Sequence, residues 1–150
     1  MIFSRLWKKH EGVRNLSSIK ISYDKNISAP AVQELYALVG WVRREPELIQ
    51  RSLQNSIAVV TAWDGESLIG FARATGDGVF NATVWDVAVH PDHQGVGVGQ
   101  LVMHALLEEL DRTKVLLVTL LAEQGQERFY KKFGFITDPS NLRGMVRERS

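Results

Sequence analysis

The 150-residue sequence contains no cysteine, which excludes disulfide bonds, thiolate-bound metals and a cysteine nucleophile. It has no apolar run near the roughly 18 residues that a membrane-spanning helix needs, so no membrane segment is expected. It also lacks an excess of either charge, because 18 Lys and Arg stand against 17 Asp and Glu, a formal net charge of +1. Such a chain has no global attraction to nucleic acid or to an anionic membrane.

The composition that remains is that of a folded globular protein, with 45% hydrophobic and 23% charged residues. The length predicts a single domain spanning residues 1–150. Residues 1–17 are basic but lack the continuous apolar stretch and the cleavage site of a signal peptide, and we interpret them as a solvated, flexible arm. A cytoplasmic location is expected, or the plastid stroma in a eukaryote.

Hydrophobic periodicity predicts an α+β fold. An edge strand is expected at residues 18–23, followed by two helices, at 30–40 and from Pro46 to about 55. Three strands follow as an antiparallel meander, with a turn signal at Asp64-Gly65. A helix with an apolar stripe then begins after a glycine-rich loop, a nearly all-apolar strand occupies residues 115–121, and a further helix (124–132) precedes a last extended segment from Gly134.

Strand, glycine loop, helix and strand make a β-α-β crossover, which implies a parallel or splayed pair inside an otherwise antiparallel sheet. The apolar run VLLVTLL (115–121) predicts that the second strand of this pair is covered on both sides.

The loop HPDHQGVGVGQ (90–100) places three glycines at alternate positions where a helix must start. The first turn of a helix has backbone N–H groups without partners and carries partial positive charge. Glycines there remove Cβ atoms and let an anion approach those donors, so the loop predicts a phosphate site.

Two phosphate-binding motifs match this loop poorly. No lysine follows Gly99, which excludes a P-loop. A dinucleotide fingerprint needs a glycine where Gln100 stands, and the intervening residues PDHQ delay the turn, although Glu123 could serve as the ribose-binding acid. That alternative is disfavoured but stays open.

A third motif fits better. QGVGVG (94–99) has the Q/R-x-x-G-x-G/A form, and RFYKKFGF (128–135) follows at a suitable distance. Together they resemble the GNAT superfamily of N-acetyltransferases over roughly residues 57–145. Residues 41–56, 70–99 and 138–145 are similar to its plastid and cyanobacterial branch, which includes serotonin N-acetyltransferases.

The resemblance implies an acetyl-CoA-dependent enzyme. It implies that a strand backbone binds the pantetheine arm and that the glycine loop binds the diphosphate. The sequence departs from the superfamily where Glu123 replaces an Asn and Gln126 replaces an Ala. The cofactor contacts expected from the resemblance are Val87, Ala88, Val89, Gln94, Gly95, Val96, Gly97, Val98, Gly99, Gln100, Glu123 and Tyr130.

Asp86 is the candidate for handling the acceptor amine, which arrives mostly as ammonium because its pKa is near 10.4. Strand alternation predicts that Asp86 shares a face with Val84 and Ala88 and points into a cleft. Its carboxylate would attract the cation and help to remove a proton, directly or through water. The alternative is an ion pair with Arg73.

Tyr130 is the candidate proton donor to the departing thiolate, as the resemblance implies for the tyrosine of this motif. A phenol is neutral at physiological pH and can donate. The alternative is an ordinary packed aromatic beside Phe129 and Phe133.

The acceptor expected from the branch is an arylalkylamine such as serotonin or tryptamine, with protein lysine or a protein N-terminus as the alternative. A non-catalytic CoA-binding module is a further alternative. Histidine and acid spacing predicts no metal site, and a homodimer through the basic arm or the final segment rests on analogy. The candidate lining of an amine pocket, which core packing would also explain, is Tyr36, Trp41, Glu45, Phe71, Asp77, Phe80 and Trp85.

Overall fold

A five-stranded sheet forms the centre of the computed structural model, which describes residues 15–137, 140 and 143–149. The strands lie side by side in chain order, and the first four are antiparallel neighbours whereas the last pair is parallel. The predicted meander and the parallel crossover pair are therefore both confirmed. The strands are β1 (Lys20–Ser22), β2 (Ala58–Asp64), β3 (Ser67–Gly76), β4 (Asn81–Val89) and β5 (Leu117–Leu120).

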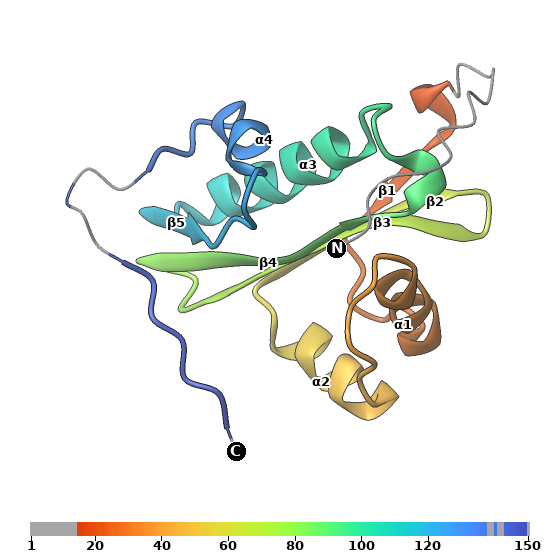
Figure 1. Cartoon of the computed structure of the whole chain (residues 1–150), viewed down its shortest axis with the longest axis horizontal. Helices are drawn as coiled ribbons and strands as arrows, with labels where there is room; N and C mark the ends of the chain where they lie inside the picture. Colours follow the sequence, from red (N-terminus) through yellow and green to blue (C-terminus); the bar gives the residue numbers. More distant parts are fainter. Residues whose placement is uncertain (1–14, 138–139, 141–142, 150) are drawn as a thin grey trace.

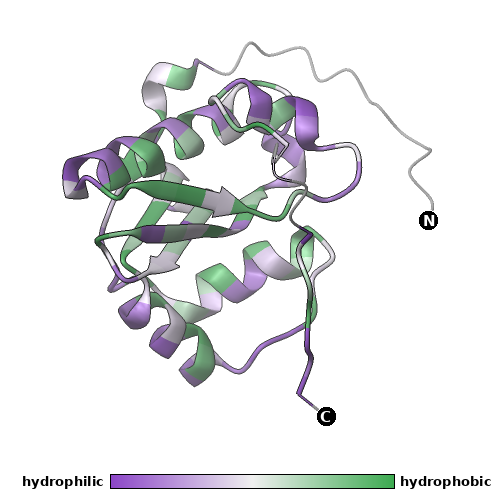
Figure 2. Cartoon of the chain, turned by 90° about the vertical axis from the view of Figure 1, so that its left-hand side faces the viewer, coloured by the Kyte–Doolittle hydropathy of each residue, from purple (hydrophilic) through white to green (hydrophobic). Residues whose placement is uncertain are grey.

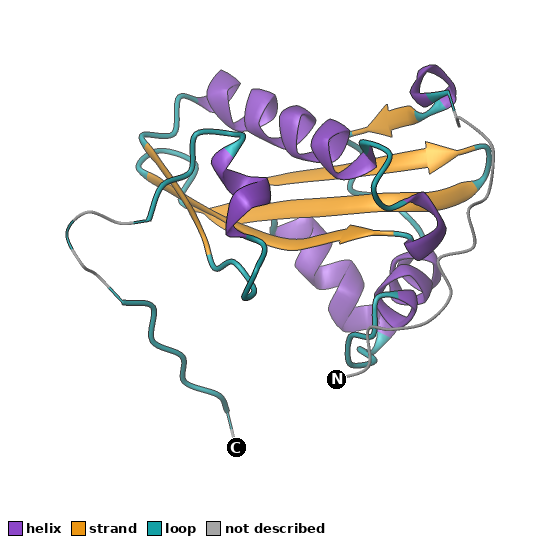
Figure 3. Cartoon of the chain, turned by 45° about the horizontal axis from the view of Figure 1, so that its top comes forward, coloured by secondary structure: helices purple, strands orange, loops and turns teal. Residues whose placement is uncertain are grey.

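Helices cover both faces of the sheet (Figures 1 and 3). On one face lie α1 (Ala29–Leu38) and α2 (Pro46–Asn55), and on the other lie α3 (Val98–Thr113) and α4 (Glu127–Lys131). The two prolines that predicted helix starts stand in the first turns of α1 and α2. Hydrophobic and hydrophilic residues alternate along the helices, as Figure 2 shows. The buried residues of α1, α2 and α3 form apolar stripes that pack against the sheet.

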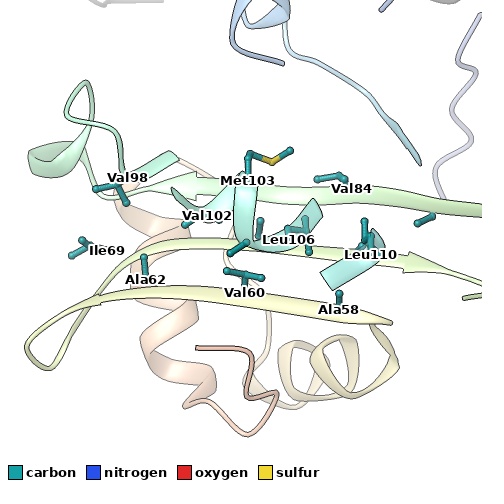
Figure 4. Close-up of a cluster of buried hydrophobic side chains, with 14 residues drawn as sticks. Ala58, Val60, Ala62, Ile69, Val84, Val98, Val102, Met103, Leu106 and Leu110 are labelled. Carbon is teal, nitrogen blue, oxygen red and sulfur yellow. The ribbon is translucent and has the colours of Figure 1, made fainter. Parts of the chain in front are cut away.

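The larger core lies between α3 and the sheet (Figure 4). Val102, Met103, Leu106 and Leu110 of α3 are buried there, which confirms the apolar stripe predicted for this helix. Burial of each such side chain contributes about 1.5–3 kcal/mol. A second core between α1, α2 and the opposite face includes Phe71 and Ala88. The two cores fix β4 from both sides.

The prediction that the strand after α3 is covered on both sides is wrong. The side chains of β5 alternate between exposed and half-buried, and Leu116 and Leu117 are 77% and 54% exposed. β5 is the last strand of the sheet, and no further strand follows it in the described residues. An apolar run therefore marked an edge strand with an uncovered side. The final extended segment expected from Gly134 likewise forms no strand over residues 135–137.

Most of the predicted basic arm, residues 1–14, lies outside the described residues. The chain after it forms a short 3-10 helix, Leu16–Ser18, and Leu16 contacts the core beneath α3. Among the described residues, no helix has both the length and the apolar character needed to cross a bilayer.

Candidate functional site

β4 and β5 separate partway along their length. Their pairing runs only from Asn81 opposite Leu117 to Val84 opposite Leu120, whereas β4 continues to Val89. The second half of β4 thus has no strand beside it on that edge in the described sheet. Backbone groups on an unpaired edge can bind an extended ligand through main-chain hydrogen bonds.

A β-bulge lies at this separation. Asp86 has a φ of +55°, and the register between β3 and β4 shifts around it. A bulge disrupts strict alternation. Val84 packs in the α3-side core, so the prediction that it shares a face with Asp86 is wrong. Ala88 packs in the core beside α1 and α2 and does share the face of Asp86, which bonds to Tyr36 there. The bulge places Trp85 and Asp86 on the same face. Trp85 Nε1 donates to the hydroxyl of Thr75, which stands two residues after Arg73 on β3, and Arg73 donates to Asp86.

The Asp86 carboxylate is held by three groups at one oxygen. Oδ2 accepts hydrogen bonds from Arg73 Nε (2.6 Å) and from the Tyr36 hydroxyl (3.1 Å). A second guanidinium, that of Arg44, lies 3.5 Å from the same oxygen. The ion pair with Arg73 that the sequence offered as an alternative is therefore present. It fixes the position of the carboxylate on the α1 side of β4.

Tyr36 is buried beneath Asp86. Burial first, and then the negative charge of Asp86, raises the pKa of the Tyr36 phenol above its ordinary range. The phenol therefore stays protonated at physiological pH and acts as a donor to Asp86.

This burial predicts an alkaline loss of stability. Above about pH 10 an unfolded tyrosine loses its proton while the folded Tyr36 keeps it, so the free energy of unfolding falls by up to about 1.4 kcal/mol per pH unit from this group. Tyr36→Phe should flatten that fall, whereas the exposed Tyr23 provides a matched control as Tyr23→Phe. Urea unfolding at pH 8.5, 10 and 11 measures the slopes. Identical slopes in the wild type and in Tyr36→Phe would contradict the assignment.

The glycine loop leads into the start of α3 without a cap. Gly97 is the residue before the helix, with a φ of +103°, and neither a side-chain cap nor an acidic residue is present in the first turn. The first backbone bond of the helix runs from Leu101 N–H to Gly97. None of the six N–H groups from Gly95 to Gln100 donates a hydrogen bond within the described part of the chain. A row of donors at a helix start attracts an anion.

The three glycines serve different purposes, which the sequence did not distinguish. A Cβ on Gly95 would meet open space, as expected for a site that a ligand approaches. A Cβ on Gly97 would lie 3.1 Å from Leu16, and one on Gly99 would lie 3.3 Å from Phe129. These two glycines therefore permit close packing around the loop.

Gln94 connects the loop to the unpaired edge. Its side-chain amide donates to the Val89 carbonyl at 3.0 Å. This bond positions the glycine loop against the end of β4.

Tyr130 lies across the sheet from Asp86. It stands on α4 and packs in the α3-side cluster, with ring centroids 5.1 Å from Phe129 and 6.2 Å from Phe135. Burial and then the charge of Glu123 raise its pKa, so the phenol stays neutral at physiological pH. Its hydroxyl makes no hydrogen bond to another described residue and is available to a ligand.

The candidate lining of an amine pocket separates into two groups. Tyr36 and Phe71 are buried core residues in edge-on contact at 5.8 Å, as the packing alternative expected, whereas Phe80 and Trp85 are exposed. Asp77 accepts hydrogen bonds from three backbone N–H groups of the β3–β4 turn, which lower its pKa and make it a turn residue.

Sequence reasoning missed Arg44 and Ser56. Ser56 is buried and accepts from Arg73 Nη1 at 3.3 Å. Both lie in the segment 41–56, but the resemblance of that segment gives them no role, and their contacts join segments far apart in the chain, so no local pattern indicates them. Among the described residues, no group of three His, Asp or Glu side chains is arranged to hold a metal ion.

Comparison with known proteins gives a consistent family. The model of the acetyltransferase (GNAT) family matches residues 26–135. An uncharacterized N-acetyltransferase ycf52 of Pyropia yezoensis is 44% identical over 131 residues, 85% of this chain and 75% of the relative. Serotonin N-acetyltransferase 2, chloroplastic, of rice is 44% identical over 124 residues, 80% of this chain and 62% of the relative.

Solved structures agree. A probable acetyltransferase of Staphylococcus aureus, SA2161, superposes with a TM-score of 0.79 at 27% identity, covering 87% of this chain and 99% of that protein. The overall fold is thus shared with that structure. The chain belongs to the GNAT acetyltransferase family and is an N-acetyltransferase.

Proposed function

We propose that the protein transfers the acetyl group of acetyl-CoA to the primary amine of an arylalkylamine, such as serotonin or tryptamine, by direct attack in a ternary complex. The observation that carries the proposal is the unpaired edge of β4. This edge extends from the glycine loop, whose six N–H groups donate no hydrogen bond among the described residues, to the bulge at Asp86. Tyr130 lies on the other side of the strand.

The described residues fit acetyl-CoA, which supplies an acetyl thioester when bound. The N–H groups of residues 95–100 would hold the diphosphate, because they are undonated and no acid stands in the first turn of α3. The backbone of Val87, Ala88 and Val89 would bind the pantetheine arm along the unpaired edge. We also place Glu123 near this ligand, because its negative charge contributes to the raised pKa of Tyr130.

Two residues on opposite faces of the sheet, Asp86 and Tyr130, would handle the two proton transfers of the reaction. In the reaction an N–C bond forms and the C–S bond breaks, while the amine loses a proton and the thiolate gains one. We assign Asp86 to attract the ammonium and to orient a water molecule that takes the proton and passes it to solvent. The carboxylate then stays charged, whereas a proton on Asp86 would leave Arg73 and Arg44 facing a neutral acid. We assign Tyr130 Oη as the proton donor to the thiolate.

The acceptor class is supported by the rice relative, which is named as a serotonin N-acetyltransferase, and by the exposed indole of Trp85 beside Asp86. A protein lysine is the second candidate, because Histone acetyltransferase TAP1 of soybean is 33% identical over 151 residues.

An amine panel tests the proposal. The protein is mixed with acetyl-CoA and with tryptamine, serotonin, a lysine peptide or buffer, and the release of free CoA thiol is followed. Fastest release with the two arylalkylamines is expected. Release only with the peptide would select the lysine alternative, and CoA binding without release would select the non-catalytic module. Binding of NAD in place of CoA would select a dinucleotide site.

We also propose a homodimer formed through the final segment, located in the cytoplasm or the plastid stroma. The final segment passes beside the end of β5, where a Cβ on Gly144 would lie 2.9 Å from Leu121, and the exposed Met145 of this segment and Leu117 of β5 support an interface at that edge. The rice and Arabidopsis relatives are named as chloroplastic. Sedimentation equilibrium should give a dimer mass, and Leu117→Lys should shift it to the monomer. A wild-type monomer at micromolar concentration would contradict the dimer.

A further inference from the structure

Two arginines share one oxygen of Asp86, and they differ in how firmly they are held. The Arg73 side chain is 14% exposed and donates from Nε at 2.6 Å. The Arg44 side chain is 46% exposed and its Nη1 stands 3.5 Å away, an ion pair without a hydrogen bond. One guanidinium belongs to the interior, and the other reaches the carboxylate from the solvent side.

Arg73 is held by the fold on its far side as well. Its Nη1 donates to the hydroxyl of buried Ser56, and the Ser56 carbonyl in turn accepts from Lys25 Nζ at 2.6 Å. The ionisable groups that contact Asp86 are thus Arg73 of β3, Arg44 of the α1–α2 loop and the neutral phenol of Tyr36, while Lys25 before α1 bonds to Ser56 behind Arg73. Two guanidinium groups contact one carboxylate, so the local charge is positive.

Arg44 is placed by contacts that do not depend on Asp86. Its backbone N–H donates to Gln33 Oε1 at 2.8 Å, and its guanidinium carbon lies 5.3 Å from the centroid of the Tyr36 ring. A half-exposed ion pair without a hydrogen bond is weak and can be displaced. An incoming ammonium would have to displace it or accept its repulsion.

We propose that Arg44 is a specificity-determining residue that occupies the cation position beside Asp86, so that the acceptor amine is held preferentially in its neutral form. The inference rests on the proposed function. Like charges disfavour the charged form of a bound amine, and only the neutral amine can attack a carbonyl carbon. Arg44 would therefore weaken the binding of total amine while raising the reactive fraction of what binds.

Arg44→Gln tests the proposal because it predicts two opposed effects. At pH 7 and low salt, KM for tryptamine should fall about two- to fivefold, the range expected for a half-exposed charge. The pKa read from the kcat–pH profile should rise by about half a unit, because the bound ammonium becomes more stable. Arg44→Lys keeps the charge and should leave the profile near that of the wild type.

Arg43→Gln is the matched control, since it removes the neighbouring exposed charge. A raised or unchanged KM in Arg44→Gln with an unmoved pH profile would overturn the proposal. Equal effects of the two Gln variants would do the same.

A failure of the proposed function can be distinguished from a failure of the inference about Arg44. If the wild type acetylates no amine, calorimetry of tryptamine binding to the CoA-saturated protein decides the inference alone. Tighter binding by Arg44→Gln than by Arg43→Gln supports it, and equal binding overturns it.

Discussion

Tyr130→Phe is expected to lower kcat about 100-fold while leaving the Kd for CoA unchanged. The substitution removes only the hydroxyl, which makes no hydrogen bond within the described chain, and keeps the ring that packs against Phe129 and Phe135. Loss of a proton donor therefore reaches the chemical step without disturbing the core. Stopped-flow release of CoA thiol and calorimetric binding of CoA measure the two quantities.

Tyr23→Phe serves as the control, because Tyr23 is exposed and follows β1 at the far edge of the sheet. Its kcat and Kd should match those of the wild type. Equal losses of turnover and of CoA affinity in Tyr130→Phe would assign Tyr130 to binding, and no loss would remove it from the reaction. A thiol leaving group of lower pKa should rescue the variant, since it needs the proton less.

Substitution of Asp86 is expected to give the largest combined loss of stability and activity. Its removal leaves Arg73 with an uncompensated charge in a nearly buried position, which costs about 3 kcal/mol. Its φ of +55° adds a separate cost for alanine of about 1–2 kcal/mol, which glycine avoids. Asp86→Ala should thus unfold at lower urea than Asp86→Gly, and Asp86→Asn, which tolerates this backbone, should be the most stable of the three.

The activity of the asparagine variant isolates the carboxylate. Asp86→Asn keeps the bulge and the side-chain volume, so a fall in kcat/KM for tryptamine of about 100-fold with unchanged CoA affinity would reflect lost handling of the amine proton. Wild-type turnover in Asp86→Asn would assign Asp86 to structure alone. Equal urea midpoints for the alanine and glycine variants would contradict the strain argument.

The elements that could be predicted from the sequence are those with a strong local period. The apolar stripe of α3 and the prolines in the first turns of α1 and α2 depend on neighbouring residues, and the structure confirms them. The order of strands followed from short connections and one long crossover. The family motifs then indicated acetyl transfer, which the comparisons confirm.

The errors have specific physical causes. The prediction that Asp86 shares a face with Val84 was wrong because alternation assumes a regular strand, and aspartate tolerates the left-handed backbone of a bulge without leaving a local pattern. The prediction that β5 is covered on both sides was wrong because apolar composition does not reveal whether a strand has a neighbour on both sides. Arg44 was not indicated, because its role depends on a carboxylate from a distant strand.

A crystal structure of the protein with acetyl-CoA tests the central claim most directly, namely that undonated main-chain amides at the start of α3 bind the diphosphate. The account predicts diphosphate oxygens within hydrogen-bond distance of the backbone nitrogens of residues 95–100, with the pantetheine arm along the unpaired edge of β4. A diphosphate bound elsewhere, with those six nitrogens facing only water, would contradict it.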